Sequence, residues 1–218
     1  TQKVLDVATS TWSDKTWSEL TDFFGNNIWT DGTNIYYSNG STQKVLDVAI
    51  STWSNKTWSG LTDFYGRDIW TDGNNIYYSD GATQKVLNVV TSTWSNKTWS
   101  GFTSLIGDFI WTDGTNIYCS RESTQKVLNI ATSTWSDKTW SGLTDFYGQY
   151  IWTDGTNIYY SNGSTQKVLD VAISTWSNKT WSGLTDFYGS HVWTDGTNIY
   201  YSSGTTQKVL ITNKKIRR

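Results

Sequence analysis

The sequence has 218 residues and a formal net charge of −2, so no basic field indicates a nucleic-acid partner. No apolar run approaches the roughly 18 residues that a membrane-spanning helix needs. The single cysteine, Cys119, excludes a disulfide within the chain.

Aromatic side chains supply much of the apolar content, with 15 Trp, 13 Tyr and 7 Phe. Such side chains bury large areas, and Trp and Tyr keep a polar group for hydrogen bonding. Proline is absent, and strand-forming Val, Ile, Tyr and Trp alternate with Thr, Ser, Asn and Gly. This composition predicts many short strands joined by turns.

The string Thr-Gln-Lys-Val-Leu recurs every 41 residues without insertion or deletion, from Thr1 to Thr206. We expect one domain over residues 1–218, with repeats 1–41, 42–82, 83–123, 124–164 and 165–205, a closing strand 206–212 and a solvated basic tail 213–218. Because the sequence begins within a repeat and contains no Met, we expect a processed product or a segment of a longer chain.

Each repeat predicts four strands. In the second repeat they are, in chain order, Gln43–Ala49, Lys56–Ser59, Asp68–Thr71 and Asn75–Ser79. A turn at Ser54-Asn55 separates the first two strands, a loop at 60–67 precedes the third, and the Asp72-Gly73 dipeptide predicts a tight hairpin before the fourth. No sustained 3.6-residue period predicts a helix.

Four strands in about 40 residues are typical of a propeller blade. The predicted fold is therefore all-β: a five-bladed β-propeller with four-stranded antiparallel blades, its ring closed by pairing of the N- and C-terminal strands. An open solenoid is the alternative, but it would expose apolar end faces and normally needs capping repeats, which the sequence does not show.

The repeat resembles a kelch repeat in a short form. Asn75–Gly81 resembles the kelch strand that ends in a double glycine, and Lys85–Asn88 with Thr91–Trp94 resembles the family's Tyr-Asp and Thr-x-x-Trp elements. Only one glycine stands where kelch repeats have two, and Leu87 replaces the family's Tyr. The resemblance implies that Ile-Trp-Thr-Asp is the innermost strand and Lys-Thr-Trp-Ser the outermost. Five-bladed lectins of the tachylectin type are a second resemblance, without a matching sugar-site motif.

This strand order requires one blade to be built from both chain ends. The C-terminus would supply the inner strands Val192–Thr194 and Asn198–Ser202, and the N-terminus the outermost strand Lys15–Ser18. Two copies compete for the remaining strand, Gln2–Ala8 and Gln207–Thr212, and covalent continuity favours the C-terminal copy. The spare copy could add to a sheet edge or pair with a neighbouring chain, because exposed strand edges invite such pairing, or it could mark the cut from a longer array.

The position pair just before the innermost strand varies while its surroundings are nearly constant. We predict that these loops ring the mouth of the channel and form the recognition surface, although drift of a tolerant loop is the alternative. The pairs are Asn26 and Asn27, Arg67 and Asp68, Asp108 and Phe109, Gln149 and Tyr150, and Ser190 and His191.

Three further features are candidate sites. The Trp-Thr-Asp-Gly strings supply a ring of Asp31, Asp72, Asp113, Asp154 and Asp195, which could face the channel or act only as turn residues. The Trp triplets could form sugar platforms or pack as core. The third repeat departs from the others at Ser104-Leu105-Ile106, Cys119 and Arg121-Glu122, which either marks a partner contact or reflects drift.

The sequence predicts binding without catalysis. One His and one Cys cannot supply a hydrolytic triad, a zinc site or the copper site of kelch-fold oxidases, so we expect no metal and no cofactor. The main hypothesis is a monomeric protein-interaction scaffold. The alternatives are a multivalent lectin with up to five equivalent sites and a designed or recently amplified repeat protein with no evolved ligand.

Overall fold

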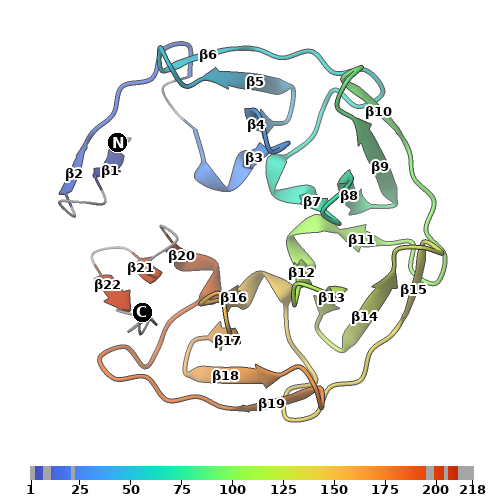
Figure 1. The fold of residues 1–218 in the computed structure, drawn as a ribbon, viewed down its shortest axis with the longest axis vertical. Coiled ribbons are helices and arrows are strands. Elements are labelled where there is room, and N and C mark those ends of the chain that lie inside the picture. The colour runs from blue at the N-terminus through green and yellow to red at the C-terminus, as the bar shows by residue number, and fades with distance from the viewer. Residues whose placement is uncertain (1–2, 7–10, 21–22, 195–198, 204–205, 211–218) are drawn as a thin grey trace, which may run out of the picture. The chain divides into compact units, whose positions relative to one another are not determined.

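The computed structural model describes residues 3–6, 11–20, 23–194, 199–203 and 206–210, which form short antiparallel strands joined by turns (Figure 1). The chain divides into two compact units, residues 1–108 with 130–134 and residues 109–129 with 135–218. Within the described part, no helix is long and apolar enough to cross a membrane.

The chain begins with a two-stranded hairpin of β1 (Lys3–Asp6) and β2 (Thr11–Asp14). The first repeat sheet follows, with the order β3 (Ile28–Thr30), β4 (Ile35–Asn39), β5 (Thr42–Asp47) and β6 (Thr52–Asn55). The second contains β7 (Ile69–Thr71), β8 (Ile76–Gly81), β9 (Thr83–Asn88) and β10 (Thr93–Asn96), and β11 (Leu105–Ile106) also pairs with β8.

Three more sheets follow along the chain. They contain β12 (Ile110–Thr112), β13 (Ile117–Arg121), β14 (Thr124–Asn129) and β15 (Thr134–Asp137); β16 (Ile151–Thr153), β17 (Ile158–Asn162), β18 (Thr165–Asp170) and β19 (Thr175–Asn178); and β20 (Val192–Thr194), β21 (Ile199–Ser203) and β22 (Thr206–Leu210). A 3-10 turn precedes the first strand of each repeat sheet: η1 (Gly25–Asn27), η2 (Gly66–Asp68), η3 (Gly107–Phe109), η4 (Gly148–Tyr150) and η5 (Gly189–His191).

The predicted all-β class and the repeated antiparallel sheets are confirmed. The last sheet has three strands, because β22 pairs with β21, whereas β2 pairs with β1. Ring closure, and the choice between the two copies of the third strand, therefore stay predictions.

The predicted outer strand was wrong by four residues. It lies at Thr52–Asn55 rather than Lys56–Ser59, and correspondingly at Thr11–Asp14 rather than Lys15–Ser18. The chain reverses earlier than expected because the Asp47 carboxylate accepts the backbone N–H of Ala49, at 3.0 Å, and thereby fixes a turn. Residues 56–59 instead run to the next sheet, where the carbonyl of Ser59 accepts the N–H of Trp94 at 2.8 Å.

Within each unit, a tryptophan of an outer strand anchors the packing between two neighbouring sheets. Trp94 is 2% exposed, and its ring centroid lies 6.2 Å from Trp29 and 6.1 Å from Trp58. In the second unit, Trp176 makes the same contacts with Trp111 and Trp140, at 6.2 and 6.1 Å. These tryptophans are core residues, as the packing interpretation of the Trp triplets expects, rather than open sugar platforms.

A glycine makes room for this tryptophan's backbone. Gly60 has φ +80°, and a Cβ placed on it would collide with the carbonyl oxygen of Trp94. A Cβ placed on Gly142 would likewise collide with the carbonyl oxygen of Trp176. Gly73 also has a positive φ, of +91°, but a Cβ there would meet nothing within 4 Å. Gly60 is thus favoured by both its conformation and its contact, and Gly73 by its conformation alone. Glu19 occupies the position of Gly60 in the first repeat and also has a positive φ, of +67°.

We predict that Gly60→Ala lowers the free energy of unfolding clearly more than Gly73→Ala, because only the first adds a collision to the strain of a positive φ. Each should cost at least about 1 kcal/mol. Urea unfolding of the two variants, side by side with the wild type, measures the difference. Equal losses would show that the close approach at Gly60 contributes nothing.

Candidate functional site

The variable position pairs lie on the 3-10 turns, and neighbouring turns touch within each unit. A Cβ on Gly66, the first residue of η2, would collide with the carbonyl oxygen of Asn27 in η1. A Cβ on Gly189 of η5 would likewise collide with the carbonyl oxygen of Tyr150 in η4. The invariant glycine therefore brings the variable residues of successive repeats side by side within each unit, and their role as a recognition surface stays a prediction.

In the first unit these positions are polar. Asn26 and Arg67 are exposed, whereas Asn27 and Asp68 are buried. The guanidinium of Arg67 lies over the ring of Tyr65, 5.1 Å from its centroid. Burial raises the pKa of Asp68 to about 7; Arg67 opposes this shift, and the carboxylates of Asp80 and Asp108 add to it.

In the second unit the second residue of each pair is aromatic, and together with two tyrosines of the repeated Asp-Phe-Tyr-Gly string these residues form a continuous row, which we call the aromatic strip. It consists of Phe109, Tyr147, Tyr150, Tyr188 and His191. Successive ring centroids are separated by 5.7, 6.3, 5.9 and 6.2 Å. Tyr188 is 41% exposed and His191 is exposed, so the strip is accessible to solvent.

Two residues peculiar to the third repeat border this strip. The hydroxyl of Tyr147 donates a 2.6 Å hydrogen bond to the carboxylate of Glu122, which raises the pKa of that tyrosine. The guanidinium of Arg121 lies over the ring of Phe109, 5.7 Å from its centroid. Arg121 and Glu122, in which the third repeat differs from the others, thus contact the first two rings of the strip. Of its other departures, Leu105 and Cys119 are buried, whereas Ser104 is exposed and Ile106 is half-buried.

Sequence analysis therefore found part of the strip. Phe109, Tyr150 and His191 were predicted as recognition residues and belong to the strip. Their neighbours do not belong to it: Gln149 is half-buried and Ser190 is exposed. Tyr147 and Tyr188 were missed, because they stand in the repeated Asp-Phe-Tyr-Gly string. Repetition gives no signal that distinguishes an exposed ring from a core ring.

The aspartates of the Trp-Thr-Asp-Gly strings organise their own turns. The carboxylate of Asp72 accepts the backbone N–H groups of Asn74 and Asn75, at 2.9 and 2.7 Å, and the hydroxyl of Tyr77 at 2.8 Å. Burial opposes ionisation of Asp72, but these hydrogen bonds prevail and lower its pKa. The same arrangement recurs at Asp31, Asp113 and Asp154. Asp195 lies outside the described residues, and a channel-facing role for this set stays a prediction.

A metal centre has no candidate in the described part of the chain, which contains no group of three or more His, Cys, Asp or Glu side chains placed to hold an ion. Cys119 is buried in β13, and the ring of His191 contacts those of Tyr188 and Tyr201, both at 6.2 Å. These two residues, each the single one of its type, pack against neighbours.

Comparison with known proteins finds structural likeness only. No family model matches the sequence, and no curated protein matches it. The fold is similar to the crystal structure of the extracellular domain of a putative hybrid two-component system from B. thetaiotaomicron, with 12% identity and a TM-score of 0.52. The match covers 93% of this chain but only 30% of that one. At this identity the likeness shows the fold alone, and the relation to kelch repeats stays a prediction.

We predict that Asp68 makes stability fall as pH rises. Its folded-state pKa of about 7 lies above the unfolded value of about 3.9, so the folded state holds the extra proton between these values. Each pH unit in that window should cost up to about 1.4 kcal/mol. Asp68→Asn, which copies the residue at Asn27, should remove this slope in urea unfolding at about pH 5 and about pH 8. Asp145→Asn, at an exposed carboxylate, should keep it; an unchanged slope in Asp68→Asn would contradict the assignment.

Proposed function

We propose that the repeats form a closed five-bladed β-propeller of kelch-like type, which acts as a non-catalytic binding module for a protein partner. The repeated four-stranded sheets and the likeness to the extracellular domain of a putative hybrid two-component system support this architecture. The three-stranded last sheet lacks the outer strand that the other repeat sheets have, and β2 carries the outer-strand sequence Thr-Trp-Ser-Asp. Closure by the strands near the two chain ends would complete a fifth blade.

The aromatic strip is the observation that carries the proposed partner. Protein interfaces are enriched in Tyr, other aromatic residues and Arg, and a few such side chains supply most of the binding free energy. Tyr150, Tyr188 and Arg121 provide these groups on or beside one exposed row. Tyrosine also contributes contact area at a low cost in conformational entropy.

The strip also favours one partner per chain over five equal ligands. The position of Tyr150 and His191 is occupied by Asn27 and Asp68 in the first two repeats, and both of these are buried. A lectin with five equivalent sites would require the same groups in every repeat. The lectin hypothesis therefore predicts a different stoichiometry from the one proposed here.

We predict that Tyr188→Ala weakens binding of a selected peptide about tenfold or more. The probes are peptides selected from a random phage-displayed library on the wild-type protein, and titration calorimetry measures affinity and stoichiometry. Tyr65→Ala is the matched control, because Tyr65 occupies the same repeat position and is 37% exposed, but belongs to the polar unit.

Binding of one peptide per chain, lost in Tyr188→Ala and kept in Tyr65→Ala, is the expected result. A glycan array that finds a sugar bound at several equivalent sites per chain, unaffected by Tyr188→Ala, would replace the proposed function by the lectin alternative.

A further inference from the structure

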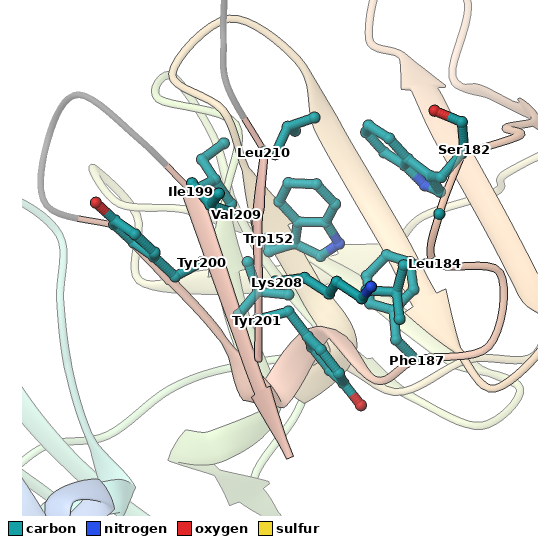
Figure 2. Close-up of a pocket in the computed structure, with 13 residues that line it drawn as sticks. Trp152, Ser182, Leu184, Phe187, Ile199, Tyr200, Tyr201, Lys208, Val209 and Leu210 are labelled. Atoms are coloured by element: carbon teal, nitrogen blue, oxygen red, sulfur yellow. The ribbon is translucent and has the colours of Figure 1, made fainter. Parts of the chain in front are cut away.

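The ring of Tyr188 faces solvent because the residue before it faces the core. Phe187 is 4% exposed and lines a pocket together with Trp152 and Tyr201 (Figure 2). Tyr188 has extended backbone, with φ −113° and ψ 130°, and successive side chains of extended backbone point to opposite sides. Its ring is therefore 41% exposed and presents an aromatic face to a partner.

A carboxylate lies next to this tyrosine. A Cβ placed on Gly163 would lie 3.5 Å from a carboxylate oxygen of Asp186 and 3.9 Å from the hydroxyl oxygen of Tyr188, so both oxygens lie within 4 Å of one point. The side chain of Asp186 is exposed. A carboxylate attracts cations, and the face of an aromatic ring carries partial negative charge. Both groups therefore favour a cationic ligand over an anionic one.

The second repeat contains the same pair of groups together with a cation. A Cβ placed on Gly40 would lie 3.4 Å from a carboxylate oxygen of Asp63 and 3.9 Å from the hydroxyl oxygen of Tyr65. The guanidinium of Arg67, two residues further along the chain, lies over the Tyr65 ring, 5.1 Å from its centroid. The chain itself thus shows which chemical group this arrangement of tyrosine and carboxylate accepts.

The fifth repeat has the pair without the cation. The position of Arg67 is occupied by Ser190, whose side chain is short and neutral. Among the residues that the structure describes, no Lys or Arg side chain lies over the ring of Tyr188. In the fourth repeat the equivalent Tyr147 is half-buried, and its hydroxyl is bound to Glu122. Tyr188 is therefore the more open of the two equivalent tyrosines of the strip.

We propose that the aromatic strip binds an arginine-containing segment of its protein partner, whose guanidinium stacks on Tyr188 beside the carboxylate of Asp186. This inference rests on the proposed function and names the chemistry of the partner. Arginine suits the place better than lysine, because a planar guanidinium can stack on a ring while its N–H groups donate to a carboxylate. A stacked and largely desolvated guanidinium should strengthen binding about fivefold to thirtyfold.

The phage-selected peptides test the chemistry of the partner. We expect every peptide whose binding is lost in Tyr188→Ala to contain an arginine. Replacement of that arginine by citrulline, which keeps the shape and removes the charge, should weaken binding about fivefold to thirtyfold in titration calorimetry. Against Asp186→Asn the same replacement should cost less, whereas against Asp63→Asn, the matched carboxylate of the first unit, it should cost as much as in the wild type. Equal affinity of the arginine and citrulline peptides would overturn the inference.

A substitution in the protein tests the same site with the peptide unchanged. Ser190→Arg copies the second repeat and should place the chain's own guanidinium over Tyr188, so that the arginine peptide binds about fivefold or more weakly. Two controls should keep binding: Ser190→Gln, which copies the neutral Gln149 of the fourth repeat, and Asn26→Arg, which adds the same charge in the first unit. Unchanged binding in Ser190→Arg, or an equal loss in either control, would contradict a cation site at Tyr188.

The inference and the proposed function fail separately. Peptides that lose binding in Tyr188→Ala but contain no arginine would keep the binding module and overturn the inference alone. Peptides whose binding Tyr188→Ala leaves unchanged, or a selection that yields no binding peptide, would overturn both, because the strip would then not be the binding site.

Discussion

The structure of each unit depends on the insertion of an outer-strand tryptophan between two neighbouring sheets. Trp94 and Trp176 are nearly inaccessible to solvent, and each lies among four other aromatic rings. Aromatic pairs at these separations add to the stabilisation from buried area. The contact joins an outer strand to the inner tryptophan of the preceding sheet, so each repeat can bury its core only beside another one.

Buried polar groups make this packing specific. The indole N–H of Trp29 donates to the hydroxyl of Ser38 at 2.9 Å, and that hydroxyl donates to the side-chain carbonyl of Gln43 at 2.6 Å. The Gln43 amide in turn donates to the carbonyl of Gly40 at 2.7 Å and fixes the turn between β4 and β5. Because an unpaired buried donor is costly, this chain of bonds constrains the register of inner and middle strands together. The indole-to-serine bond and the bond from the glutamine amide to the turn recur in three further sheets, in keeping with the recurrence of Ser and Gln in the repeats.

Variation is concentrated at positions that this framework leaves free, although Leu105 and Cys119 of the third repeat differ within the core. The 3-10 turns are held by the approach of a glycine to a carbonyl, a backbone contact that places no demand on the following two side chains. The second of those side chains is polar in the first unit, at Asn27 and Asp68, and aromatic in the second, at Phe109, Tyr150 and His191. The repeated scaffold thereby presents a surface whose side chains differ from one repeat to the next. A multivalent binder with equivalent sites would need the same side chains in every repeat.

The sequence by itself determined the repeat, the all-β class and the positions that vary, because a fixed period and strand-forming composition leave few other solutions. It placed the inner strands correctly, since Asp-Gly turns have a strong local signal, but it misplaced the outer strand, whose turn depends on the Asp47 side chain. Only the tertiary structure decided which aromatic rings are exposed. Tyr188 and Phe187 are adjacent in a repeated string, yet one faces solvent and the other packs in the core, because exposure depends on what the neighbouring sheet covers.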